Sequence, residues 1–181
     1  MLSTPNFSTE DFTVIINNLD DTFTLRADGR SWITQIGDWD LSAADIATVL
    51  VNIPSLPDTT ARWWVLNPDP AEGNATLQLL SAYPFTEAPT VVELFIEADQ
   101  GYFEVNVQDK PNPVRKEELY NDSWLPSEYL SDVEDAGYTV TSPWIVQPVL
   151  DQDGQHRVLR CVAIASPMNA EEWVPIWTEV Q

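Results

Sequence analysis

The sequence contains a single cysteine and a single histidine among its 181 residues. One cysteine excludes an intramolecular disulfide and any zinc site built on paired cysteines. No apolar run approaches the roughly 18 residues that span a bilayer, and residues 1–12 lack the basic start and the apolar stretch of a classical secretion signal. We therefore expect a fold held by packing alone, no membrane partner, and a location in the cytoplasm or in a virion assembled there.

Positive charge is also scarce, because 8 Lys and Arg stand against 29 Asp and Glu, which gives a net charge of −21 at pH 7. The excess of acids is similar in residues 1–60, 61–120 and 121–181, so it is not an acidic tail. Such a surface repels phosphate backbones, and the one cluster of cations, formed by Lys110, Arg115 and Lys116, is small. The charge predicts no direct contact with nucleic acid.

Glycine is sparse, with 6 residues against 14 prolines. The hydrophobic fraction of 44% and the aromatic fraction of 10% are high enough to form a core despite the charge. Rigid prolines among many Thr, Val and Ile residues favour short strands that are interrupted by turns. We expect a mainly β protein, α+β at the margin, which forms an antiparallel β-sandwich or barrel with one or two short helices.

Local patterns place the expected elements along the chain. Strands are predicted at 12–17, 22–26, 31–36, 48–53, 62–66, 77–83, 91–97, 102–107, 144–150, 157–164 and 173–180. One helix is predicted from a cap at Asp40 or Ser42 to Leu50, and another from a cap at Ser127 to Ala136, with Gly137 as its stop.

The chain shows no repeat of solenoid length and no low-complexity tract. Its length fits a single globular domain that covers residues 1–181. The segment Asp109–Pro113 has two prolines and no apolar residue, so it is typical of a linker or a long loop. If the chain has two subdomains, we expect the division near residues 109–114.

The candidates for chemistry are few. Asp151 and Asp153 precede a glycine in a predicted hairpin turn, which makes them a weak calcium candidate. An ordinary acidic turn is favoured, because Gln155 and Val162 stand where an EF-hand needs further ligands. We expect His156 to be a solvated turn residue and Cys161 to be a small buried hydrophobe. The sequence predicts neither a bound metal nor a cofactor, and it offers no catalytic residue.

Tryptophan is abundant, with eight residues. Trp63 and Trp64 are adjacent in a predicted strand, so their side chains point to opposite faces and at most one lies in the core. Trp63, Trp64, Trp124 and Trp144 are the candidate interaction residues. If they are exposed together, they form a contact patch, and if they are buried, they belong to the core.

The favoured hypothesis is a non-enzymatic structural or interaction protein with protein partners or further copies of itself, for example a phage virion, tail or capsid-cementing subunit. One alternative is an acidic DNA mimic that inhibits a nucleic-acid-binding enzyme, motivated by the net charge. The other is a carbohydrate-binding module or an enzyme whose site is assembled from distant residues. The acidity has a further explanation, because it also maintains solubility in a salty cytoplasm.

Overall fold

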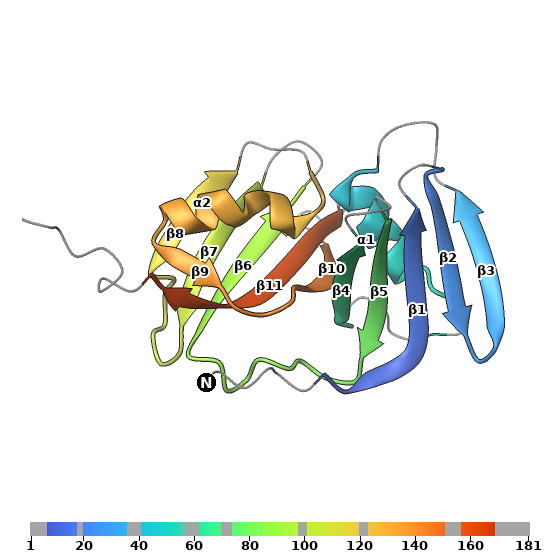
Figure 1. The fold of residues 1–181 in the computed structure, drawn as a ribbon, viewed down its shortest axis with the longest axis horizontal. Coiled ribbons are helices and arrows are strands. Elements are labelled where there is room, and N and C mark those ends of the chain that lie inside the picture. Colours follow the sequence, from blue (N-terminus) through green and yellow to red (C-terminus); the bar gives the residue numbers. More distant parts are fainter. Residues whose placement is uncertain are drawn as a thin grey trace, which may run out of the picture.

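Antiparallel strands and two short helices make up the computed structural model (Figure 1). It describes residues 7–17, 20–35, 41–54, 56, 62–69, 74–97, 101–119, 123–150 and 157–168. The strands are β1 (Thr9–Asn17), β2 (Thr22–Ala27), β3 (Arg30–Gln35), β4 (Trp64–Asp69), β5 (Asn74–Leu80), β6 (Thr90–Ile96), β7 (Gly101–Val107), β8 (Arg115–Leu119), β9 (Tyr138–Val140), β10 (Ile145–Leu150) and β11 (Arg157–Pro167). The helices are α1 (Ala43–Val51) and α2 (Leu130–Asp135), and a 3₁₀ turn, η2 (Pro126–Tyr129), precedes α2. The mainly β class is confirmed, and the sheet is not closed into a barrel.

The same arrangement of five strands occurs twice in the sheet. From edge to edge, the order is β3-β2-β1-β5-β4-β10-β11-β6-β7-β8, and β9 pairs with β11. In the first unit, β1, β2 and β3 form a meander, the chain passes through α1, and β4 and β5 complete the sheet beside β1. The second unit repeats this with β6, β7 and β8, then α2, then β10 and β11. The chain therefore contains two units of equal topology, which lie side by side in Figure 1.

The two units meet where β4 and β10 pair edge to edge. Val65 lies opposite Ile145, and the Leu66 amide donates to the Trp144 carbonyl at 2.9 Å. A two-fold axis placed between Val65 and Ile145 would exchange these two residues and would also exchange Trp64 with Trp144. The residues at the equivalent positions are similar, as in Trp64-Val65-Leu66-Asn67-Pro68 and Trp144-Ile145-Val146-Gln147-Pro148. The topological repeat is therefore visible in the sequence of this stretch.

The main core lies on the face of the sheet that the helices cover. Its cluster of buried residues includes side chains from both units, among them Phe23 and Trp64 from the first and Phe103 and Tyr129 from the second. Side chains alternate along the strands between this face and the other, as in β6, where buried and half-buried residues alternate without interruption. The two units therefore share one continuous core.

Helix α1 begins as predicted and ends later than predicted. The Ser42 hydroxyl accepts from the Asp45 amide, and the Asp45 carboxylate accepts from the Ser42 amide, which together form a capping box. The strand predicted at 48–53 is wrong, because the helix continues to Val51. Leu50 is fully buried in the core, and this packing outweighs the β preference of the neighbouring residues. Among the strands, α1 packs chiefly against β10 and β11 of the other unit.

The second helical segment forms close to where it was predicted. Ser127 is not its N-cap, because η2 begins at Pro126 and includes Ser127, and proline is well suited to the first helical position. Gly137 follows the end of α2 with a φ of 94°, so the predicted stop is confirmed. No helix in the described part of the chain combines the length and the apolar character needed to cross a bilayer.

The strands predicted at 22–26 and 31–36 pair as an antiparallel hairpin, and so do those predicted at 91–97 and 102–107. The β2–β3 turn places Asp28 and Gly29 at φ values of 50° and 71°, which is the left-handed conformation that a two-residue turn of type I′ requires. Strand β8 was not predicted, and the predicted loop at 109–113 forms the connection from β7 to β8. The strand predicted at 173–180 lies outside the described residues.

Candidate functional site

Three of the four candidate tryptophans are core residues. Trp64, Trp124 and Trp144 are 0%, 6% and 7% exposed within the main cluster. Trp63 is partly buried and packs against a second cluster on the other face, so the predicted opposition of Trp63 and Trp64 is confirmed. The three buried indoles have a packing role, and Trp63 is the one of the four that keeps exposed surface.

The face opposite the helices carries this second, smaller cluster. Its buried members are Val65, Leu80, Phe85, Ile145 and Val162. The segment between β5 and β6 packs here, where Tyr83 lies between Trp63 and Phe85 at ring distances of 5.2 Å and 5.9 Å. The pairing of β4 with β10 is therefore supported by apolar contacts on both faces of the sheet.

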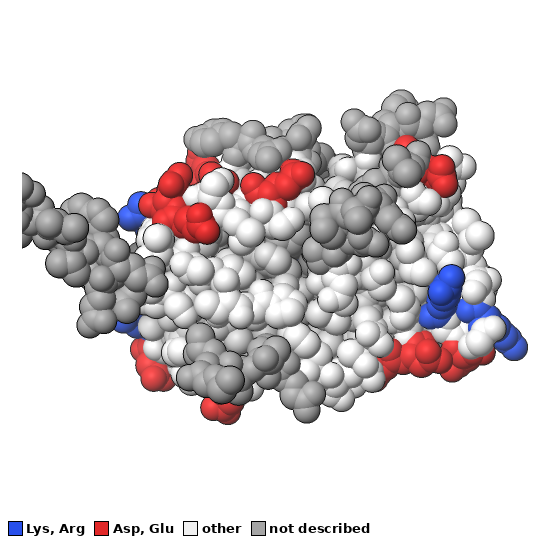
Figure 2. Space-filling view, viewed as in Figure 1, with Lys and Arg blue, Asp and Glu red and all other residues white. Residues whose placement is uncertain are grey.

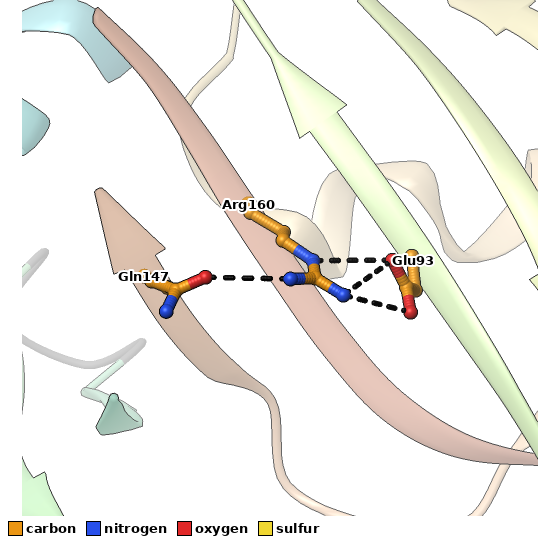
Figure 3. Close-up of polar contacts among 3 residues, drawn as sticks. All are labelled: Glu93, Gln147 and Arg160. Carbon is orange, nitrogen blue, oxygen red and sulfur yellow. Dashed lines mark hydrogen bonds and ion pairs between the residues drawn. The ribbon is translucent and has the colours of Figure 1, made fainter. Parts of the chain in front are cut away.

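Arg160 on β11 forms a charged network on this second face (Figure 3). Its Nε and Nη2 atoms donate to both carboxylate oxygens of Glu93 at 3.0 to 3.1 Å, and Nη1 donates to Gln147 Oε1 at 3.4 Å. The guanidinium also lies 5.1 Å from the ring centroid of Trp63. Because Glu93 is on β6 and Gln147 on β10, the network connects three adjacent strands.

A row of stacked groups continues from Arg160 across β6, β7 and β8. The rings of Phe95 and Tyr102 stack at 4.7 Å with an interplanar angle of 17°. Arg160 lies over Phe95 at 5.9 Å, and Lys116 lies over Tyr102 at 4.5 Å. Each ring therefore has one face against its neighbour ring and the other against a cation. A sugar or a base needs a free aromatic face for stacking, so this row fits a role in stabilising the sheet.

Cys161 is fully buried in the main core, as predicted. Burial raises the pKa of its thiol well above the ordinary value of 9.0, because the thiolate would lose its hydration. Burial is also the largest cause that raises the pKa of Tyr83 and of Tyr102 above 10.0. These groups keep their protons in the folded state at pH values where the unfolded chain releases them.

This difference predicts a loss of stability at alkaline pH. The unfolded chain releases the Cys161 proton near pH 9.0 while the folded protein retains it, so stability is complete below that pH and declines above it by about 1.4 kcal/mol per pH unit. We expect this decline between pH 9 and pH 10, measured by urea unfolding, to be less steep for Cys161→Ala, in which the contributions of Tyr83 and Tyr102 remain. The alanine variant also leaves a cavity, so the two proteins are compared by the slope of their unfolding free energy against pH. Equal slopes would contradict the raised pKa of Cys161.

The predicted acidic turn, with the calcium candidates Asp151 and Asp153 and with His156, lies outside the described residues. In the part of the chain that the structure describes, no group of three or more His, Cys, Asp and Glu side chains is placed to hold a metal ion. The ordinary acidic turn, which the sequence favours, and the weaker calcium alternative therefore both stay predictions.

A groove of about 430 Å³ lies between β3 and the end of α1. The described residues that line it are uncharged and mostly apolar: Val14, Phe23, Leu25, Trp32, Ile33, Thr34, Thr48, Val49, Asn52, Ile53 and Pro54. The Thr48 hydroxyl donates to the Ala44 carbonyl at 2.8 Å, and the side-chain amide of Asn52 donates through Nδ2 to the Thr48 carbonyl at 2.7 Å. The side-chain donors of Thr48 and Asn52 thus already have acceptors within α1, so the groove suits an apolar occupant.

The groove is bounded by the outer strand of the sheet. Because α1 packs chiefly on β10 and β11, it leaves part of β3 uncovered, with Trp32 partly buried and Ile33 75% exposed. Within the described ranges, β3 pairs with β2 alone. Its outer row of backbone N–H and C=O groups is therefore placed to pair with another strand. We call this edge, together with the groove, the β3 site.

The equivalent edge of the second unit is different in character. Strand β8 carries four consecutive charged residues, Arg115, Lys116, Glu117 and Glu118, whereas β3 has Arg30 alone. Charged side chains on an outer strand discourage pairing with other chains. The registers with β7 and β2 place Glu118 at the position of Ile33. Of the two outer strands, β3 is therefore the one suited to association. The sequence did not predict this site, because local sequence does not contain the strand order.

Comparison of the chain with family models, with curated proteins and with solved structures finds no match.

Proposed function

We propose that this protein is a non-enzymatic interaction protein that acts as a subunit of a larger protein assembly and makes its contact through the β3 site. The observation that supports this proposal most strongly is an outer strand with Arg30 as its single charged residue, beside a mostly apolar groove. Partners that add a strand to a sheet edge gain affinity from backbone hydrogen bonds, and pockets beside the edge select their side chains. The β3 site offers both elements.

The distribution of charge supports contact with protein. On the face shown in Figure 2, the described acids form separate groups at the margins, and uncharged side chains occupy the middle. A mimic of nucleic acid needs its acids in a continuous line. The charged network around Arg160 is used within the sheet, where it pairs with Glu93 and Gln147. The β3 site therefore supports binding to another protein more directly than these features support mimicry or sugar binding.

Photo-crosslinking tests this proposal at the β3 site. A photoreactive amino acid in place of Ile33, in cells that produce the protein at its natural level, is expected to form an adduct of discrete mass upon illumination. Ile33 is suitable because it is 75% exposed at the outer strand. Mass spectrometry of the adduct should map the crosslink to one defined peptide of a partner protein or of a second copy.

The matched control is the same amino acid in place of Glu118, which occupies the equivalent position on β8 and is also exposed. It is expected to form no discrete adduct, because charged neighbours surround it. The absence of an adduct at position 33, or equal adducts at both positions, would contradict the proposed contact surface.

A further inference from the structure

We infer that the partner at the β3 site is a second copy of this chain, and that the two β3 strands pair antiparallel about a two-fold axis. This inference rests on the proposed function and names its partner. When identical strands pair in this way, the N–H and C=O groups of both outer edges find partners at once. The sheet then continues from one copy into the other.

Charge favours a second copy over a basic partner. Two copies that each carry a net charge of −21 repel one another, so they can meet only where charge is lowest. The described residues of the groove lining include no charged side chain, and β3 contributes one, Arg30. A basic partner would be recognised through acids at the contact, and neither β3 nor the described residues of the groove lining include an acid. An edge strand with a single charged residue is the surface on which like-charged copies can approach.

The chain already contains a contact of this kind. Within one molecule, the equivalent strands β4 and β10 pair antiparallel, with Val65 opposite Ile145. Apolar side chains support that pairing on both faces of the sheet. Pairing of β3 with β3 of another copy would repeat the same arrangement at the outer edge, with the groove as the apolar support on one face.

The side chains of β3 fit this arrangement. Trp32 points to the helix side and forms part of the groove wall, so in a pair it would lie beside the tryptophan of the other copy. Ile33 points to the opposite face, where it is 75% exposed, and pairing would cover it. A contact of six residues with one groove is small among protein interfaces, so we expect a dissociation constant in the micromolar range, about 1 to 100 µM.

Sedimentation velocity of the purified full chain tests the inference. We expect a monomer–dimer equilibrium that becomes tighter, by at least about threefold, when NaCl is raised from about 50 mM to about 500 mM, because salt screens repulsion between like-charged copies. A partner bound through opposite charge shows the reverse dependence. A chain that stays monomeric throughout the micromolar range would overturn the inference, as would a dimer that salt weakens.

One lysine substitution on each outer strand, at equivalent positions of β3 and β8, locates the contact. Ile33→Lys is expected to weaken the dimer at least about tenfold, because it places like charges close together at the new pairing. Glu118→Lys, at the equivalent position on β8, should leave the dimer unchanged. Both positions are exposed, so both variants should keep the far-ultraviolet circular dichroism of the parent. A dimer that Ile33→Lys does not weaken would show that it forms elsewhere.

Disulfide trapping gives an independent measurement. Ile33→Cys lies in the middle of β3, so under oxidation it should link two copies, whereas Glu118→Cys should not. The natural Cys161 does not interfere, because it is fully buried. If the crosslinker at position 33 captures a different protein and the purified chain is monomeric, the inference fails while the proposed function stands. If it captures nothing, the proposed function fails as well.

Discussion

Replacing Trp64 by alanine is expected to lower the free energy of unfolding by about 3 to 5 kcal/mol. The indole is fully buried in the main core, at the joint between the two units. Its removal leaves a cavity that a packed sheet and helix cannot close, so neighbouring side chains lose their contacts. Because small proteins have total stabilities of about 5 to 15 kcal/mol, the urea midpoint should fall sharply. Far-ultraviolet circular dichroism measures this without relying on tryptophan emission.

The adjacent residue provides the matched control. Trp63→Ala should lower the free energy of unfolding by about 1 to 2 kcal/mol, because Trp63 is only partly buried and loses mainly its contacts with Tyr83 and Arg160. Trp144, which is 7% exposed at the equivalent position of the second unit, should behave like Trp64. Equal losses at Trp63 and Trp64 would contradict the assignment of these two side chains to opposite faces.

Replacing Arg160 by methionine should lower the free energy of unfolding by about 2 to 3 kcal/mol. The Glu93 side chain is only 12% exposed, and Arg160 donates three hydrogen bonds to its carboxylate. Without the guanidinium, a largely buried carboxylate keeps its charge without a partner. The partial exposure of Arg160, at 30%, places the expected loss below that for a fully buried pair. Urea unfolding at neutral pH measures it.

An exposed ion pair and a double variant serve as controls. Arg115→Met breaks the ion pair between Arg115 and Glu117, whose two side chains are 50% and 34% exposed, respectively. This variant should lose less than about 1 kcal/mol of unfolding free energy. Combining Arg160→Met with Glu93→Met should recover part of the stability, because no unpaired charge remains. If Arg160→Met were as mild as Arg115→Met, the network in Figure 3 would not stabilise the sheet.

Much of the fold is predictable from local sequence, because most strands have one covered and one open face. In β6, Glu93 stands between two buried apolar residues, and this alternation marks a strand. Strand β8 was missed because its run of charged residues has no alternation. The strand expected at 48–53 was wrong because β-branched residues at the end of α1 are held in a helix by tertiary packing, for which Leu50 is the anchor.

The candidate site was much less predictable. A strand at 31–36 was expected, but its place at the edge depends on the strand order of the whole sheet. The groove depends on α1 packing across the other unit, which no local pattern contains. The roles of Trp124 and Trp144 could not be separated from that of Trp63 by counting aromatic residues. The similarity between 64–68 and 144–148 is one signal in the sequence that would have predicted the equivalence of β4 and β10.

The unlike outer strands limit how far such molecules can grow. A sheet whose two outer strands can both pair with other copies adds molecule after molecule and extends into a fibre. Here the lysine, arginine and glutamates of β8 close one end of the ribbon. The proposed association through β3 would therefore terminate at a closed pair, and the divergence of the two halves would protect a protein so rich in β structure from uncontrolled polymerisation.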